Sequence, residues 1–232
     1  DGMDMGNAYR KICFFDSRGL VVKGRSNLTD QKMLYAHELA EESNLESAIN
    51  SLQPNILIGV SGQGGAFSEP IVRKMGEIND RPIIFALSNP TSKSECTAEQ
   101  AYTWTKGRAV FVSGSPFDPV TYKDQTFYPG QGNNAYIFPG VGLGVVVSKS
   151  SRVTDDMFIA AADTLVDLVS EEDLAKGRLY PSLIKIREIS CKIAVNVAKQ
   201  AFENNIAWVP QAENLEKCVE DSMFKPKYKS YV

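Results

Sequence analysis

An apolar run that changes abruptly to small polar residues constrains this chain most: Ile83-Ile84-Phe85-Ala86-Leu87 leads directly into Ser88-Asn89-Pro90-Thr91. Uninterrupted apolar runs of this length are typical of parallel strands that are covered on both faces. Polar residues that follow such a strand lie at the carboxyl edge of the sheet, where open α/β sheets bind their ligands. The Asn89 amide can both donate and accept hydrogen bonds, which suits a hydroxy- or keto-acid. The alternative is that Asn89-Pro90 only closes a strand as a turn.

Other apolar runs alternate with helix-forming segments along the first half of the chain. The pattern predicts strands at Lys11–Phe15, Asn55–Val60 and Ala109–Val112, and helices at Met33–Glu41, Asn44–Leu52, after Ser68 and after Thr97. Such alternation predicts a Rossmann-like, doubly wound α/β fold with a mostly parallel sheet. Only ten residues precede Lys11, and they contain no glycine-rich turn. We therefore expect the sheet to be truncated at its N-terminal strand.

The second part of the chain has a different pattern. Residues 154–170 and 182–205 read as long amphipathic helices, and the tail from Gln211 is rich in charge. We predict a dinucleotide-binding domain at residues 1–150. Residues 151–232 are then C-terminal helices and a tail that pack on that domain or on a partner.

Composition narrows the class of protein. The chain is 43% hydrophobic with a net charge of −3 and scattered Lys and Arg, so we expect neither nucleic-acid binding nor a membrane span. The cysteines, Cys13, Cys96, Cys191 and Cys218, form no CxxC pair, which favours reduced thiols in a cytosol-like compartment. The single histidine, His37, is expected to be an ordinary surface or half-buried helix residue. One histidine cannot form a histidine-based metal cluster.

Asp16 is a candidate cofactor residue because it follows the first predicted strand. In dinucleotide-binding folds an acid at this place hydrogen-bonds the adenosine ribose. The neighbouring Ser17 and Arg18, with Lys32 further on, offer a hydroxyl group and cations for a 2′-phosphate. The alternative for Asp16-Ser17-Arg18-Gly19 is a plain turn.

Two glycine-containing segments add candidate residues. Ser61-Gly62-Gln63-Gly64-Gly65 follows the predicted strand at Asn55–Val60 but lacks the GxGxxG spacing, so its interest lies in its position. Gly130-Gln131-Gly132-Asn133-Asn134 places two side-chain amides before a helix that begins near Ala135. A helix amino end binds anionic ligands, although either asparagine can equally serve as the helix cap.

Taken together, these motifs resemble the carboxyl-terminal part of malic enzyme. They occur in the family's order and spacing across nearly the whole chain. The matching segments are Phe15–Leu20, Lys23–Arg25, Ile58–Val60, Arg81–Thr91, Glu95–Glu99, Ser113–Phe117, Pro129–Asn134 and Gly177–Pro181.

The resemblance implies an activity: oxidative decarboxylation of malate to pyruvate and CO₂. It implies that Asn89, Asn133 and Asn134 contact malate or pyruvate, and that Asn89 and Asn134 also lie near the nicotinamide. It further implies that the cofactor contacts Asp16, Ser17, Lys32, Gly59 and Ser61. Ser17 and Lys32 resemble the NADP-preferring members, with NAD as the alternative cofactor.

The family's acid–base pair, its malate-binding arginine, the ligands of its magnesium or manganese ion and its glycine-rich turn all precede the matching region. We therefore assign no catalytic or metal-binding residue to this chain and expect a separate N-terminal domain and a homo-oligomer. The chain alone is expected to be inactive. Its acidic amino end lacks a signal-peptide pattern, which favours the cytoplasm, with the mitochondrial matrix as the alternative. Two further hypotheses stay open: a non-catalytic nucleotide-binding or assembly module, and an amino-acid dehydrogenase.

Overall fold

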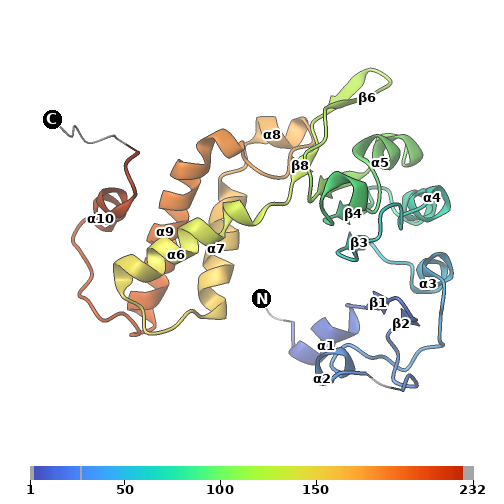
Figure 1. The fold of residues 1–232 in the computed structure, drawn as a ribbon, viewed down its shortest axis with the longest axis horizontal. Helices are drawn as coiled ribbons and strands as arrows, with labels where there is room; N and C mark the ends of the chain where they lie inside the picture. The colour runs from blue at the N-terminus through green and yellow to red at the C-terminus, as the bar shows by residue number, and fades with distance from the viewer. Residues whose placement is uncertain (1–2, 27, 227–232) are drawn as a thin grey trace. The chain divides into compact units, whose positions relative to one another are not determined.

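The computed structural model describes residues 3–26 and 28–226 and separates into two compact units, residues 1–129 and 130–232 (Figure 1). Each unit has its own hydrophobic core. The functional boundary expected at residue 150 stays a prediction.

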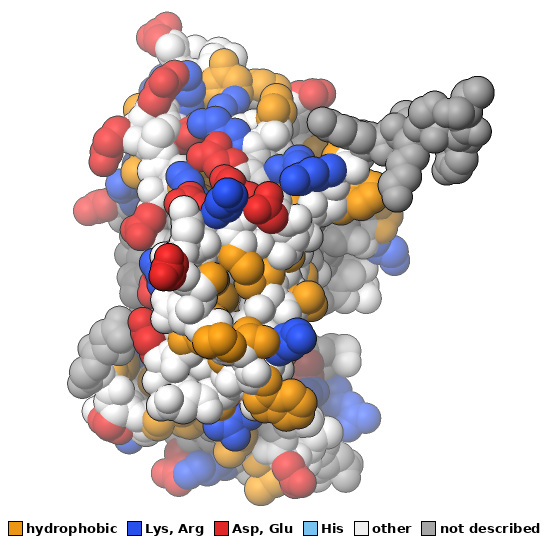
Figure 2. Space-filling model, turned by 90° about the vertical axis from the view of Figure 1, so that its left-hand side faces the viewer, with side chains coloured by type: hydrophobic (Ala, Val, Ile, Leu, Met, Phe, Trp, Pro, Cys, Tyr) orange, Lys and Arg blue, Asp and Glu red, His pale blue; other side chains and the backbone are white. Residues whose placement is uncertain are grey.

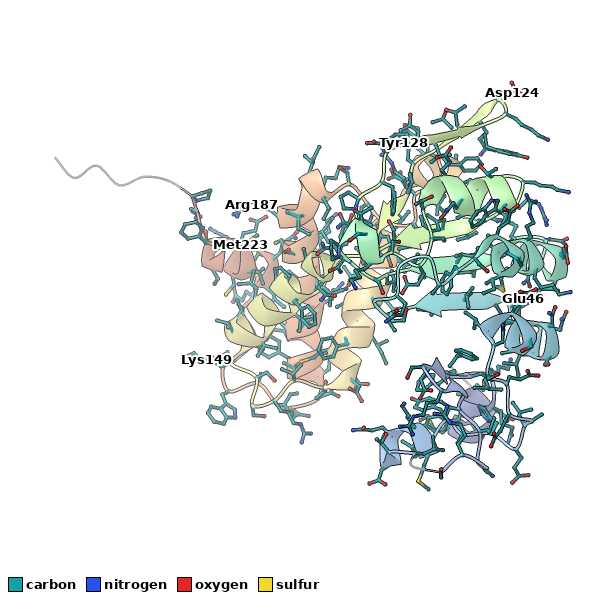
Figure 3. All side chains as sticks on the ribbon, turned by 45° about the vertical axis from the view of Figure 1, so that its right-hand side comes forward. Glu46, Asp124, Tyr128, Lys149, Arg187 and Met223 are labelled. Carbon is teal, nitrogen blue, oxygen red and sulfur yellow. The ribbon has the colours of Figure 1, made fainter. Side chains whose placement is uncertain are left out.

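The first unit is α/β, as predicted. Its elements in chain order are α1 (Met5–Arg10), β1 (Phe15–Asp16), β2 (Gly19–Leu20), α2 (Asp30–Met33), α3 (Leu45–Leu52), β3 (Ile56–Gly59), α4 (Glu69–Ile78), β4 (Ile83–Ala86), the 3-10 helix η1 (Thr91–Lys93), α5 (Ala98–Trp104), β5 (Val110–Ser113), β6 (Val120–Tyr122) and β7 (Gln125–Phe127). The last two strands form a hairpin, and Asp124 lies at its tip (Figure 3).

Strands β3, β4 and β5 form a parallel sheet in which Ile56 pairs with Ile83 and Ile83 with Val110. One face of this sheet is covered by α4 and α5. The core there contains aromatic and aliphatic side chains that exclude water almost completely, among them Met75, Ile84, Tyr102 and Phe111. On the other face the β3 side chains are largely open: Ile56 is 51% exposed and Ile58 is 56% exposed.

The helices expected after Asn44, Ser68 and Thr97 are confirmed, and their first turns differ in capping. Asn44 caps α3 by accepting from the Glu46 N–H. Thr97 and Gln100 form a reciprocal capping box at the start of α5. Ser68 precedes α4 and Pro70 lies in its first turn, although the Ser68 hydroxyl makes no capping hydrogen bond.

The predicted buried strand at Lys11–Phe15 is wrong. Only Phe15 and Asp16 are in a strand, and they form a short antiparallel hairpin with β2 rather than joining the parallel sheet. Phe14 stacks on Tyr35 at 4.3 Å between ring centroids and stays partly exposed. The turn at Asp16, whose carboxylate accepts from the Arg18 N–H, reverses the chain before a longer strand can form.

The predicted helix at Met33–Glu41 is also wrong. Helix α2 ends at Met33, and the chain then forms an isolated bridge between His37 and Val22. His37 is half-buried, as expected, but it lies outside any helix and its Nε2 is 2.7 Å from the Ile12 carbonyl oxygen. Long-range pairing has overridden helix propensity in this segment.

The second unit is mainly helical. Its elements are β8 (Gly130–Gln131), η2 (Asn134–Tyr136), α6 (Phe138–Ser148), α7 (Asp155–Asp167), α8 (Glu171–Ala175), η3 (Leu183–Lys185), α9 (Ile186–Glu203) and α10 (Leu215–Ser222). Helices α7 and α9 confirm the two long helices expected from the sequence. None of the helices in the described part of the chain is long and apolar enough to cross a bilayer.

Close packing of α6 against α9 organises this unit. A Cβ atom added to Gly140 would lie 2.6 Å from Ile193 Cγ2, and one added to Gly144 would lie 2.6 Å from the Ala194 carbonyl oxygen. Glycine at both positions therefore lets the two helix backbones approach each other. Around this contact lie fully buried side chains such as Ile193 and Val197.

We predict that Gly144→Ala destabilises the chain by about 1–3 kcal/mol, because the new methyl group forces two packed helices apart. The matched control is Gly142→Ala on the same helix, where an added Cβ meets no atom within 4 Å. That control should be neutral or should stabilise by up to about 1 kcal/mol, since alanine favours the helix. Thermal unfolding of the variants measures both effects. Equal midpoints for the two variants would contradict the close-packing account.

Candidate functional site

The carboxyl ends of β3, β4 and β5 meet at one edge of the sheet, because Gly59, Ala86 and Ser113 are paired in register. The loop Ser61–Gly65 leaves this edge after β3, and Ser88 and Asn89 leave it after β4. Both Ser61 and Asn89 are exposed, and the Asn89–Pro90 peptide bond is cis. The structure thus places these two predicted ligand-binding residues at the sheet edge where the sequence locates them.

A buried carboxylate that the sequence analysis did not single out lies beneath these loops. Glu95 is completely buried, and its side chain accepts hydrogen bonds from Ser61 and from Ser88. Hydrophobic periodicity gives no signal for such a residue, because the partners of Glu95 come from distant parts of the chain. Glu95 does begin the segment Glu95–Glu99 that resembles the family, but the resemblance assigned it no role.

Gly59 has a packing role. A Cβ atom at this position would lie 2.5 Å from the Glu95 carboxyl carbon and 2.8 Å from Phe67 Cζ. Only glycine therefore leaves room for the buried glutamate at the end of β3. The cofactor contact expected for Gly59 stays a prediction.

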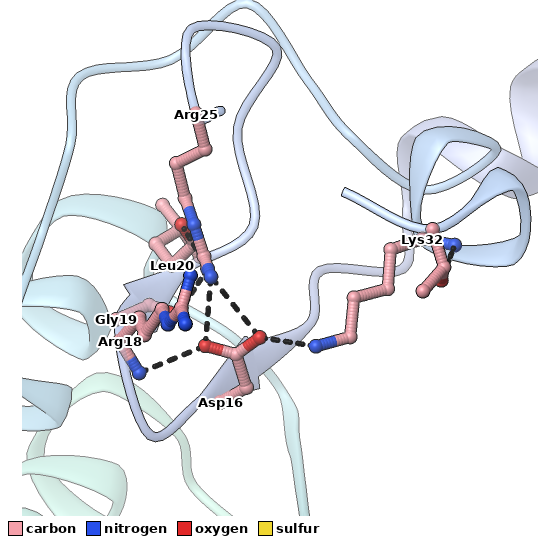
Figure 4. A network of polar contacts seen from close by, with 7 residues as sticks. Asp16, Arg18, Gly19, Leu20, Arg25 and Lys32 are labelled. Atoms are coloured by element: carbon pink, nitrogen blue, oxygen red, sulfur yellow. Dashed lines mark hydrogen bonds and ion pairs between the residues drawn. The ribbon is translucent and has the colours of Figure 1, made fainter. Parts of the chain in front are cut away.

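Asp16 lies in a cluster of cationic side chains (Figure 4). Its Oδ1 accepts from the Arg18 N–H at 2.9 Å and from Arg25 at 3.0 Å. Its Oδ2 accepts from Arg25 at 3.1 Å and from the Lys32 ammonium group. Partial burial raises the pKa of the Asp16 carboxyl, but these hydrogen bonds and the charge of Arg25 outweigh it and lower the pKa from 3.8 to about 2.

These contacts determine which ligand groups the Asp16 cluster can bind. A carboxylate has about four acceptor positions, and here four donor contacts take them up. Asp16 is therefore poorly placed to accept from a ribose hydroxyl unless one cation moves away. The side chain of Lys32 is 39% exposed and the neighbouring Ser17 is exposed, so donors rather than acceptors face the solvent. Arg25, at 11% exposure, is a cluster member that the sequence analysis did not single out.

The two asparagines predicted to contact the substrate lie at the start of the second unit. Both are exposed, and Asn133 caps η2 because its Oδ1 accepts from the Ala135 N–H at 2.8 Å. The capping alternative is thus realised for Asn133, and its NH₂ group remains the part of the amide that can serve a ligand. The following Tyr136 is buried, donates to the Pro181 carbonyl oxygen at 2.7 Å and stacks on Tyr180. These contacts join two of the motifs noted in the sequence.

Asn89 belongs to the first unit and Asn133 and Asn134 to the second, and each unit is described by itself. The convergence of these three amides on one substrate stays a prediction, as do the cofactor roles of Asp16, Ser17, Lys32 and Ser61.

The described residues contain no group of three or more His, Cys, Asp or Glu side chains that could hold a metal ion. The four cysteines are free thiols. Burial, with the charge of Glu95 adding to it, raises the pKa of Cys96 to about 12, which makes this thiol a poor nucleophile at neutral pH. On the face drawn in Figure 2, acidic and basic side chains are intermixed rather than gathered by sign.

A parallel sheet with polar loops at its carboxyl edge, helices alternating with its strands and a charged cluster after an early strand define a Rossmann-like α/β domain of the nucleotide-binding class. The sequence profile described as "Malic enzyme, NAD binding domain" matches residues 1–202. The chain therefore belongs to the malic enzyme family.

Relatives and solved structures agree with this assignment. The chain is 50% identical to the NADP-dependent malic enzyme of Columba livia, 51% identical to that of Homo sapiens and 51% identical to NADP-dependent malic enzyme 1 of Arabidopsis thaliana. These matches cover 100%, 98% and 96% of the chain but only 42%, 40% and 39% of the relatives. The chain thus spans about two fifths of their length.

The fold is shared with the crystal structure of Entamoeba histolytica malic enzyme, with a TM-score of 0.70 and 24% identity over 91% of this chain and 41% of that one. Malic enzyme from Pyrococcus horikoshii superposes with a TM-score of 0.60 and the same identity over 82% of this chain and 39% of that one. Membership of this family disfavours the amino-acid dehydrogenase hypothesis.

The Asp16 cluster predicts a specific pH dependence of stability. The pKa of Asp16 is lower in the folded state, so its stabilising effect is complete above its ordinary pKa of 3.8 and is lost as the pH falls through about 2. The free energy of unfolding should therefore differ most between wild type and Asp16→Asn above pH 3.8. The difference should shrink as the pH falls toward 2.

Urea unfolding at a series of pH values measures this difference, and the other carboxyl groups cancel because both proteins contain them. Asp124→Asn, at the exposed hairpin tip, is the control for loss of one negative charge. A difference for Asp16→Asn that stays constant over this range would show that the cluster does not stabilise the fold through the ionised carboxylate.

Proposed function

We propose that this chain is the cofactor-binding part of an NADP-dependent malic enzyme, which converts malate to pyruvate and CO₂ with reduction of NADP. The proposal of NADP rather than NAD rests on the cluster of charged side chains around Asp16. A 2′-phosphate needs hydrogen-bond donors and positive charge, whereas an unmodified ribose needs a free acceptor. Lys32, Arg25 and the Ser17 hydroxyl supply the donors, and the Asp16 carboxylate is already engaged. The names of the relatives at about 50% identity support the same choice.

In this proposal the chain's own residues bind and orient the reactants. Lys32 binds the 2′-phosphate. Arg25 and Asp16 hold the Lys32 side chain and the surrounding backbone in place. The loop that begins at Ser61 approaches the cofactor from the end of β3. NADP bound there would supply the hydride acceptor for oxidation of the alcohol carbon of malate.

Three side-chain amides orient the substrate. Asn89 after β4 and Asn133 and Asn134 after β8 are neutral at every pH, and each can pair with a carboxylate or a hydroxyl group. Holding malate against the nicotinamide is a proximity effect, which is among the largest contributions to enzymatic rate enhancement. Proton transfer at the substrate and the hold on magnesium or manganese are assigned to residues outside this chain.

A second candidate concerns the chain in isolation. It spans about two fifths of its relatives, so by itself it is proposed to be a non-catalytic nucleotide-binding or assembly module. The full-length protein is proposed to be a homo-oligomer, which sedimentation analysis tests. Free cysteines support a reducing compartment, the cytoplasm or the mitochondrial matrix, which cell fractionation distinguishes.

We expect the full-length protein to produce NADPH when malate and manganese or magnesium are present, and to release pyruvate and CO₂ in equal amounts. Absorbance of the reduced cofactor and a pyruvate assay measure the reaction. Isothermal titration of the isolated chain with NADP tests the second candidate. Complete inactivity of the full-length protein toward malate with either nucleotide would remove the proposed activity.

Lys32→Gln in the full-length protein should lower the ratio of kcat/KM for NADP to that for NAD by about ten- to a hundred-fold, since a charged hydrogen bond to the phosphate is lost. The matched control is Lys23→Gln, an exposed lysine that pairs with Glu38 on the same part of the chain. Steady-state kinetics with both cofactors gives the ratios. If Lys32→Gln and Lys23→Gln leave the ratio equally unchanged, Lys32 does not contact the 2′-phosphate.

A further inference from the structure

The buried carboxylate of Glu95 connects the two loops to which the proposed function assigns ligand binding. Its Oε1 accepts from the Ser61 N–H and the Ser61 hydroxyl, both at 3.1 Å, and from the Ser88 hydroxyl. Its Oε2 accepts from the Ser88 N–H at 3.3 Å. One side chain thus joins the loop after β3 to the loop after β4.

Glu95 is the acceptor in all four contacts, and the two backbone N–H groups can only donate. An ionised carboxylate only accepts hydrogen bonds, whereas a protonated acid or an amide also presents a donor. Each serine hydroxyl donates its proton to Glu95 and accepts elsewhere: Ser61 Oγ from the Gln63 N–H at 3.2 Å, and Ser88 Oγ from the Gly62 N–H at 2.8 Å. Glu95 is therefore the common acceptor of this set of hydrogen bonds.

The main chain around Glu95 holds the far end of the same loop. The Phe67 N–H donates to the Glu95 carbonyl oxygen at 2.9 Å, and the Gly65 N–H donates to the Ser94 carbonyl oxygen at 3.1 Å. The segment that carries Glu95 consequently binds the loop where it leaves β3 and again just before α4. A loop held at both ends by one segment has little freedom to move relative to β4.

We propose that Glu95 is a positioning residue, which fixes the loop Ser61–Gly65 and the segment Ser88–Asn89 relative to each other for binding of cofactor and substrate. Ser88 immediately precedes Asn89, so the hydrogen bonds of Ser88 set the direction from which the Asn89 amide leaves the sheet. A buried charge is costly unless it is hydrogen-bonded, and the four donors here supply that compensation. The inference rests on the proposed function only for the identity of the ligands.

The first test is Glu95→Gln in the full-length protein. Glutamine has the same shape, but its NH₂ group faces N–H and O–H donors of Ser61 or Ser88, so at least one contact becomes repulsive. We expect amide hydrogen exchange to accelerate in residues 59–67 and 86–92. We also expect KM for NADP and malate to rise about ten-fold with a smaller change in kcat, because small misplacement of binding groups is costly.

The control is Glu99→Gln, an exposed glutamate four residues further along, for which exchange and kinetics should match wild type. Unchanged exchange in both loops of Glu95→Gln would overturn the inference. So would exchange that accelerates equally across α9 and the rest of the chain, because the role of Glu95 would then be general stability.

A second variant keeps the test valid if Glu95→Gln does not fold. Ser88→Ala removes one hydroxyl group and deprives the Gly62 N–H of its acceptor. If the loops are coupled through Glu95, exchange should accelerate at Ser61 and at residues 63–65, beyond the Gly62 N–H that loses its acceptor directly. Acceleration confined to Gly62 and residues 86–92 would contradict the coupling.

Ligand binding tests the proposed function, whereas hydrogen exchange tests the role of Glu95. If wild-type full-length protein binds neither NADP nor malate, the proposed ligands are wrong. The exchange experiment still decides whether Glu95 fixes the two loops.

Discussion

In-register parallel pairing of β3, β4 and β5 is the constraint on which the candidate site depends. The register brings Gly59, Ala86 and Ser113 side by side, so that the residues after each strand emerge at the same edge. The fully buried contacts of Ile84 and Phe111 with α4 and α5 hold this register, because a slip by one residue would turn these side chains away from the core. The positions of the candidate site residues at the sheet edge therefore depend on the packing of the hydrophobic core against the sheet.

Charge is handled in two different ways in the first unit. Asp16 is surrounded by the cations Arg25 and Lys32, which leaves a corner of donors open to solvent. The hydrogen-bond partners of Glu95 are instead the hydroxyl and backbone N–H groups of Ser61 and Ser88, which carry no charge. The cations around Asp16 are suited to binding a negatively charged ligand. The buried Glu95 is suited to holding two loops in fixed positions.

The sequence predicted those parts of the fold that depend on near neighbours. Helix α5 begins at its capping box, and β4 follows from an apolar run with a defined end. The segments at Lys11–Phe15 and Met33–Glu41 were predicted wrongly, because a turn at Asp16 and the bridge between Val22 and His37 override local propensity. Among site residues, Asn89 was placed correctly at the sheet edge. Glu95 was missed, since its partners lie 7 to 34 residues away in sequence.

Strand β3 is the terminal strand of the sheet in the described part of the chain, and it presents Ile56 and Ile58 to solvent. Val60, directly after the strand, is 75% exposed. An exposed, hydrophobic edge strand of this kind can pair with strands of other molecules and so cause aggregation. The practical consequence concerns recombinant preparation: we expect residues 1–232, expressed by themselves, to precipitate through this exposed edge strand. A charged substitution at Ile58, which faces away from the packed core, is the direct remedy for obtaining soluble material.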